Sequence, residues 1–174
     1  MVKVFRCIIC KEAYMGDEKP KQCPYCGAHE KYIIFAKDWI ESVVGELNET
    51  DKENVKKALQ LEIDNAKFYF CASNNTKNIE GQAMFKRLGK VEREHADVWC
   101  KILRIALPEI KAAETCAEDY QEQLKDSHAR EERAINFYKK AANQAQNERV
   151  KQVFEAVVEV EKDHLGLSEE RMIK

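Results

Sequence analysis

Val91-Glu92-Arg93-Glu94-His95 recurs 69 residues later as Val160-Glu161-Lys162-Asp163-His164, and this repeat decides the fold. Other positions match at the same offset. They pair Glu62, Phe68, Tyr69 and Phe85 with Glu131, Phe137, Tyr138 and Phe154, and Asn74 and Asn78 with Asn143 and Asn147. Self-similarity at a fixed offset indicates two copies of one structural unit. We therefore predict two similar helical hairpins.

Caps and periodicity place the helices. Thr50 and Glu53 form a T-x-x-E capping box, which predicts that the first helix starts there. Four helices are expected, over about residues 50–75, 79–106, 116–143 and 147–171, and Pro108 belongs to the connection between the second and third. Each carries an apolar stripe at alternating spacings of three and four, as in helical bundles. The predicted fold is all-α, an antiparallel four-helix bundle with a long crossover.

Glutamates interrupt these apolar stripes near their middles. Buried carboxylates must be paired, neutralised or bound to metal, and two divalent cations would balance four of them. A glutamate and a histidine three apart share a helix face, so each E-x-x-H can direct two ligands at a metal. One such motif is more often a solvated face, but two in a repeat match the di-iron or di-manganese pattern of ferritin-like bundles. The predicted ligands are Glu62, Glu92, His95, Glu131, Glu161 and His164.

Three further residues on the stripes are candidates for catalysis. Tyr69 and Tyr138 lie two turns after Glu62 and Glu131, where they could hydrogen-bond ligand carboxylates or pass protons and electrons. Ordinary core tyrosines would show the same pattern. His128 lies one turn before Glu131 and could donate a proton, although a histidine near solvent would look the same.

Cysteines define a second metal site near the N-terminus. Cys7 and Cys10 form one C-x-x-C pair, and Cys23 and Cys26 form another after twelve intervening residues. This spacing predicts a tetrahedral four-sulfur site in a segment too small to fold by burial alone, and it leaves iron and zinc both possible. The chain has seven cysteines, and disulfides are the weaker interpretation. We assign no role to the other three, which are Cys71, Cys100 and Cys116.

Composition limits the remaining classes. Charged residues make up 34% of the chain and the net charge is -2, so a nucleic-acid partner is not expected. No apolar run is long enough for a membrane span and no signal-peptide core precedes the cysteines, which predicts a cytoplasmic protein. The expected domains are a metal-binding module over residues 1–36, a linker over residues 37–49, and the bundle over residues 50–174.

The sequence resembles the rubrerythrins, in the arrangement called reverse rubrerythrin, where a rubredoxin-like module precedes a ferritin-like bundle. The likeness rests on the twelve-residue gap, Pro20 before Cys23, the C-P-x-C-G knuckle, and Tyr69 seven residues after Glu62. It implies a di-iron peroxidase for oxidative-stress defence that reduces hydrogen peroxide with electrons passed through an iron held by the four cysteines. It also implies an external donor such as rubredoxin or an NAD(P)H-dependent reductase. The resemblance further implies a homodimer in which electrons pass from the cysteine site of one subunit to the di-iron site of the other. The connection between the second and third helices could cross over within one chain or exchange helices between subunits.

Two positions differ from the family pattern. Lys11 stands where rubredoxin-like knuckles have glycine, which keeps zinc open at the cysteine site. Ala134 stands where typical rubrerythrins have an additional glutamate, which favours a ferroxidase or dioxygen reductase as the alternative. A third possibility is a non-redox metal-binding protein in which a zinc ribbon serves as an interaction handle.

Overall fold

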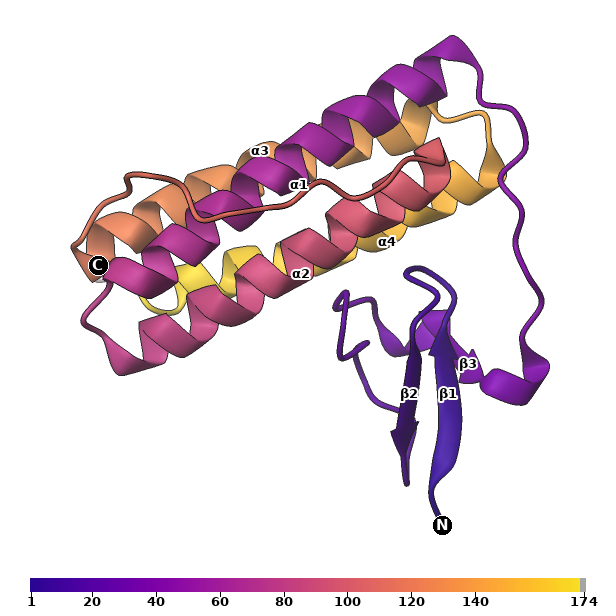
Figure 1. The fold of residues 1–174 in the computed structure, drawn as a ribbon, viewed down its shortest axis with the longest axis horizontal. Helices are drawn as coiled ribbons and strands as arrows, with labels where there is room; N and C mark the ends of the chain where they lie inside the picture. The colour runs from indigo at the N-terminus through magenta and orange to yellow at the C-terminus, as the bar shows by residue number, and fades with distance from the viewer. Residues whose placement is uncertain (173–174) are drawn as a thin grey trace.

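The computed structural model describes residues 1–172. Its main body is a bundle of two helical hairpins, shown in Figure 1. The helices are α1 (Glu49–Asn75), α2 (Ile79–Leu103), α3 (Tyr120–Gln144) and α4 (Glu148–Glu169). α1 packs mainly against α2, and α3 mainly against α4. The predicted four-helix bundle is confirmed. Within the described residues, none of the helices has a segment apolar enough to cross a membrane.

The observed helix boundaries differ from the predicted ones, and the structure gives the reason at three ends. The capping box at Thr50 was wrong, because Asn48 is the N-cap and its Oδ1 accepts a hydrogen bond from the backbone N–H of Asp51 at 2.8 Å. α2 ends at Leu103, since Arg104 adopts a left-handed conformation with φ of 58°. α3 begins only at Tyr120, because the Asp119 carboxylate caps its first turn.

The crossover between α2 and α3 runs back along the bundle over residues 104–119. Figure 1 shows it lying along α1 within the same chain. The backbone N–H of Ala113 donates to the Lys67 carbonyl at 3.0 Å. Near its far end, Cys116 forms a disulfide with Cys71 of α1. From the sequence we assigned no role to these two cysteines and took disulfides as the weaker interpretation, but the path of the crossover brings this pair together.

The N-terminal module is a three-stranded antiparallel sheet with two short 3-10 turns. Its strands are β1 (Lys3–Cys7), β2 (Ala13–Gly16) and β3 (Ile33–Phe35), in the order β2-β1-β3. The 3-10 turns are η1 (Glu30–Tyr32) and η2 (Ala36–Asp38). After η2, the chain has no regular structure until α1 begins. The small sheet positions the two cysteine turns at one end of the module.

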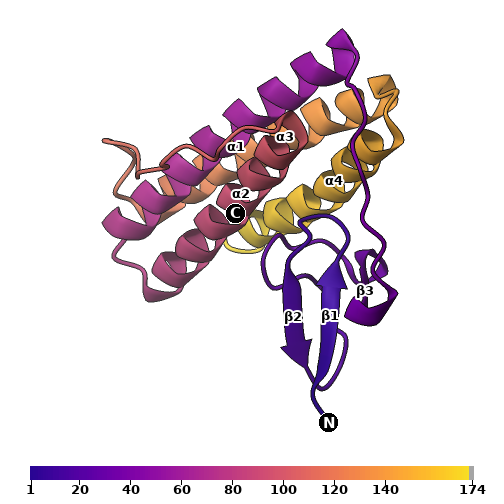
Figure 2. The ribbon, with the colours of Figure 1, turned by 45° about the vertical axis from the view of Figure 1, so that its right-hand side comes forward.

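The module lies against α2 and α4 of its own chain, as Figure 2 shows. Ile9 of the module shares one apolar cluster with Trp99 and Phe154 of the bundle. Polar contacts surround this cluster: Arg149 of α4 donates to the Ile9 carbonyl at 2.7 Å. Burial of the shared apolar surface, bordered by hydrogen bonds, fixes the module relative to the helices.

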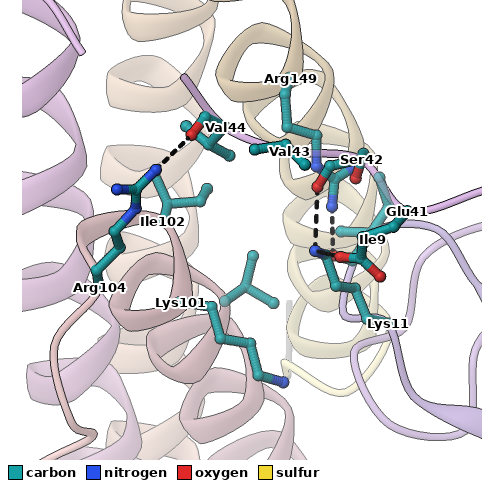
Figure 3. A pocket seen from close by; sticks show the side chains of 11 residues that line it. Ile9, Lys11, Glu41, Ser42, Val43, Val44, Lys101, Ile102, Arg104 and Arg149 are labelled. Atoms are coloured by element: carbon teal, nitrogen blue, oxygen red, sulfur yellow. Dashed lines mark hydrogen bonds and ion pairs between the residues drawn. The ribbon is translucent and has the colours of Figure 1, made fainter. Parts of the chain in front are cut away.

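The linker passes over the junction between the module and the bundle. A cavity of about 180 Å³ lies there, beneath linker residues 41–44 (Figure 3). Lys11 contacts the Glu41 carboxylate and the Ser42 carbonyl, and Arg104 donates to the Val44 carbonyl at 3.0 Å. Basic side chains thus hold the linker by its carbonyls as it passes from module to bundle.

The Cys71–Cys116 disulfide should stabilise the bundle measurably. The linked residues are 45 apart in sequence, and chain-entropy arguments give up to about 4 kcal/mol for a loop of that length. We expect Cys116→Ser to lower the free energy of unfolding in denaturant titrations and to speed proteolysis within residues 104–119. Cys100→Ala, which alters a buried free cysteine, is the control. Equal unfolding midpoints and cleavage rates for both variants would contradict this prediction.

Candidate metal centres

The four cysteine sulfurs of the module already form a compact cluster. Cys7 Sγ lies 3.7 Å from Cys26 Sγ, and Cys10 Sγ lies 3.7 Å from Cys23 Sγ. All four sulfurs lie within 4.8 Å of one another, and all four cysteines are free and buried. A tetrahedral metal with bonds of about 2.3 Å to sulfur separates its ligands by about 3.8 Å. The cluster therefore fits one tetrahedral metal ion.

The two cysteine turns have the same backbone geometry despite their different sequences. Lys11 follows the first pair with φ of 73°, and Gly27 follows the second with φ of 75°. The N–H of Lys11 donates to the Cys7 carbonyl at 2.9 Å, and the N–H of Gly27 donates to the Cys23 carbonyl at 3.0 Å. In the first turn, the N–H of Ile9 also points to Cys7 Sγ at 3.4 Å. Lys11 thus takes the conformation that glycine usually supplies, at some cost in backbone strain.

The six predicted bundle ligands converge from all four helices on one buried site. Glu62 comes from α1, Glu92 and His95 from α2, Glu131 from α3, and Glu161 and His164 from α4. Their ligand atoms form two groups. One contains Glu62, Glu92, His95 and Glu161, and the other contains Glu92, Glu131, Glu161 and His164. Because Glu92 and Glu161 belong to both groups, their carboxylates can bridge two metal ions.

Both histidines turn the Nδ1 atom toward the carboxylates. His95 Nδ1 lies 3.1 Å from Glu92 and 3.4 Å from Glu161. His164 Nδ1 lies 3.1 Å from each of the same two glutamates. The two imidazole rings face each other across the site, with centroids 6.4 Å apart. In this arrangement Nδ1 is the nitrogen of each ring that could bind a metal.

The carboxylates have the unsatisfied oxygens that a pair of cations would occupy. Each glutamate has one buried oxygen without a hydrogen-bond partner among the described residues: Glu62 Oε2, Glu92 Oε1, Glu131 Oε2 and Glu161 Oε1. Burial alone would lower the pKa of His164, but the negative charge of Glu92 and Glu161 outweighs it and raises that pKa to about 10. Without metal, protons compensate the carboxylates, so metal binding must release protons.

A tyrosine from each hairpin holds a carboxylate of the other. The Tyr69 hydroxyl of α1 donates to Glu131 of α3, and the Tyr138 hydroxyl of α3 donates to Glu62 of α1. Both tyrosines are fully buried. The sequence placed them near these ligands, and the structure identifies the partner of each as the glutamate of the opposite hairpin.

His128 is not brought into this site. Its ring is half-buried on α3, and Nε2 lies 3.7 Å from the exposed Glu132. In the part of the chain that the structure describes, it contacts none of the six candidate ligands. The inward position one residue earlier belongs to Ser127, which is 1% exposed.

Comparisons with known proteins identify the family of this chain. The rubrerythrin family model matches residues 53–172, which is most of the chain. The chain belongs to the rubrerythrin family. It is also similar to Reverse rubrerythrin-1 of Clostridium acetobutylicum, with 26% identity over 113 residues. That match covers 59% of this chain and 62% of the relative, which is less than two thirds of its length.

A solved structure supports the fold of this rubrerythrin-family chain. KatB, a manganese catalase from Anabaena, superposes with a TM-score of 0.59 at 17% identity. The superposition covers 79% of this chain and 78% of that one. At this identity the likeness concerns the fold alone, which is ferritin-like.

In this member of the rubrerythrin family, one hydrogen bond joins the two candidate metal centres. His95 turns Nδ1 toward the bundle site, while its Nε2 lies 2.8 Å from the carbonyl oxygen of Cys26. The carbonyl can only accept, so Nε2 carries the hydrogen and Nδ1 is left with a lone pair for metal. His164 has no such contact from Nε2 to the described backbone. Sequence alone could not reveal the bond, because the order of the motifs says nothing of how the module docks.

Glu92→Ala should empty the bundle of metal while the cysteine site stays loaded. Glu92 contributes to both ligand groups, so its loss weakens both metal positions. Metal analysis of the purified variant would then find metal only at the four cysteines. Glu155→Ala, which alters an exposed carboxylate on α4, should keep the full metal content. Loss of metal from both centres in Glu92→Ala would instead indicate that the glutamate is needed for folding.

Proposed function

We propose that this protein is a di-iron peroxidase that reduces hydrogen peroxide to water with electrons delivered through an iron at the four-cysteine site. The observation that carries the proposal is the 2.8 Å contact between His95 Nε2 and the Cys26 carbonyl. It gives a path of few bonds, from a cysteine ligand of one centre to a histidine ligand of the other. A redox-inert zinc at the cysteines would make no use of that connection.

The protein would prepare the bundle site for this reaction in two ways. Iron bound there would supply the electrons that break the O–O bond. Tyr69 and Tyr138 hold Glu131 and Glu62 by hydrogen bonds, which fixes the carboxylates of the two hairpins relative to each other. Phe85 and Phe154, both fully buried, pack against these tyrosines and keep bulk water out.

The contact with Cys26 supports electron transfer within one chain. A route between subunits, which the family resemblance implies, is not required when the module docks on its own bundle. We therefore propose that a homodimer, if formed, is not needed for the internal transfer. The electrons themselves would come from an external donor such as rubredoxin or an NAD(P)H-dependent reductase.

A second candidate function is a ferroxidase or dioxygen reductase. Ala134 of α3 is fully buried, and its methyl group cannot supply the additional carboxylate of typical rubrerythrins. The six-ligand set is then symmetric between the two hairpins. A non-redox metal-binding protein with zinc at the cysteines is the remaining alternative, and it predicts a colourless module.

Metal content and a visible spectrum would test the proposed function first. We expect iron in both centres and a red absorption from the cysteine-bound iron, which bleaches with dithionite and returns when peroxide is added. Stopped-flow mixing of the reduced protein should give faster oxidation by peroxide than by dioxygen. Faster oxidation by dioxygen would favour the oxidase, and zinc at the cysteines would contradict the electron route.

Gly27→Ala should slow the internal electron transfer without emptying either centre. A Cβ at Gly27 would lie 2.8 Å from Val160 Cγ1 of α4, so the turn holding the Cys26 carbonyl must move away from His95. Peroxide should then reoxidise the cysteine-bound iron more slowly in single-turnover absorbance traces.

A double variant separates displacement of the turn from strain within it. Gly27→Ala with Val160→Ala keeps a side chain at φ of 75° but removes the clash, and should restore the rate. Val160→Ala alone is the control and should leave the rate unchanged. If Gly27→Ala transfers electrons as fast as the wild type, the path through His95 is refuted.

A further inference from the structure

The two halves of the bundle site differ in what surrounds their tyrosines. The Tyr69 hydroxyl has a second partner, Ser127 Oγ at 2.9 Å, in addition to Glu131. At the offset of the internal repeat, Ser127 corresponds to Ala58, which has no hydroxyl to offer Tyr138. Tyr138 instead stacks on Trp99, with ring centroids 6.1 Å apart. Among the described residues, its hydroxyl contacts only Glu62.

The directions of the hydrogen bonds at Tyr69 are fixed by its single hydroxyl hydrogen. Tyr69 donates to the Glu131 carboxylate, so its oxygen must accept from Ser127 Oγ. Ser127 then has its lone pairs free to accept from a further donor. The hydroxyl groups of Ser127 and Tyr69 thus form an ordered row of hydrogen bonds that ends at the carboxylate of the candidate ligand Glu131. All three are at most 1% exposed.

Gln123 extends this row toward the surface of the bundle. It lies one turn before Ser127 on α3 and is fully buried. Its Nε2 donates to the Ala117 carbonyl of the crossover at 2.7 Å, while its Oε1 is buried without a hydrogen-bond partner. A water molecule donating to both Gln123 Oε1 and Ser127 Oγ would satisfy each acceptor. Ala117 is half-buried and Glu118 exposed, so this end of the row is close to solvent.

We propose that Ser127, supported by Gln123, forms a one-sided proton uptake route that delivers protons through Tyr69 to Glu131. The proposal rests on the peroxidase function, since reducing one peroxide to two waters takes up two electrons and two protons. For each proton, the Tyr69 hydroxyl gives its hydrogen to Glu131 and receives that of Ser127. Ser127 is replenished from water at the Gln123 end. Glu131 then passes the proton to the peroxide oxygen, and no charge accumulates along the row.

The route lies away from the cysteine module. Tyr138, Trp99 and Phe154 share an apolar cluster with the module, whereas Tyr69 and Leu124 belong to a separate cluster at the crossover end. Electrons would therefore arrive at one side of the bundle site and protons at the other. Ser127 is a positioning residue in this scheme, because it acts on the reaction only through Tyr69.

Exchange of the tyrosine hydroxyl hydrogens with solvent tests the route without any turnover. The full chain would be loaded with zinc and labelled with carbon-13 at the tyrosine ring carbon that carries the hydroxyl, and NMR would report exchange at Tyr69 and Tyr138. We expect faster exchange at Tyr69 than at Tyr138. Ser127→Ala should slow the Tyr69 exchange by about tenfold, the scale of one lost hydrogen bond, and leave Tyr138 unchanged.

The internal repeat supplies the matched control. Ala58→Ser places a hydroxyl at the equivalent position of the other hairpin and should speed exchange at Tyr138. Ser127→Thr keeps the hydroxyl and should preserve exchange at Tyr69, which separates a relay from a loss of packing. Gln123→Met, which removes the polar end of the row, should slow exchange at Tyr69 as well.

An unchanged Tyr69 exchange rate in Ser127→Ala, or equal slowing at both tyrosines, would overturn the relay. In the iron-loaded protein, Ser127→Ala should also slow peroxide-driven proton uptake, read with a pH indicator, while the cysteine site is reduced at the wild-type rate. A wild type that reduces no peroxide would refute the proposed function but leave the exchange measurement interpretable.

Discussion

Four buried carboxylates at the centre of a helical bundle are the constraint on which the rest of this structure depends. Glu62, Glu92, Glu131 and Glu161 lie on four different helices and are fully buried. Four negative charges in so small a volume repel one another strongly unless cations or protons compensate them. Two metal ions held by these carboxylates would remove that repulsion and tie all four helices together. The same metals that carry the chemistry would therefore also hold the bundle.

The N-terminal module is docked through a candidate ligand of the same site, His95. His95 can present Nδ1 to metal only if its ring is oriented and its other nitrogen keeps the hydrogen. The Cys26 carbonyl supplies that partner at 2.8 Å, so a turn that could bind one metal also orients a candidate ligand of another. The close approach of Gly27 to Val160 is needed for this, because a side chain at that position would hold the turn away from α4.

The sequence predicted the fold and the candidate ligands because both depend on local spacing that is repeated. An E-x-x-H fixes two side chains on one helix face, and its recurrence with Glu62 and Glu131 identifies one site rather than several. Features that depend on how distant segments meet were not predictable. The Cys71–Cys116 disulfide depends on the path of the crossover. The N-cap at Asn48 is a local contact with Asp51, and it was missed because the T-x-x-E pattern at Thr50 offered a competing start. Spacings of three and four residues before Glu131 both fit the stripe, so the sequence left His128 as either a proton donor or a histidine near solvent. The buried position is Ser127, four residues before Glu131.

The crossover has a consequence for symmetry. Two identical hairpins associating as separate chains could build the same six-ligand site, but every residue near one tyrosine would then appear beside the other. Because residues 104–119 join the hairpins into one chain, the residues around the tyrosine of one hairpin can differ from those around the tyrosine of the other. Ser127 contacts Tyr69, whereas the equivalent residue in the other hairpin is Ala58. Trp99 stacks on Tyr138, whereas its equivalent in the other hairpin is Ser168. Covalent connection thus converts a two-fold site into one with distinguishable sides, and a reaction that takes up both electrons and protons can use such a difference.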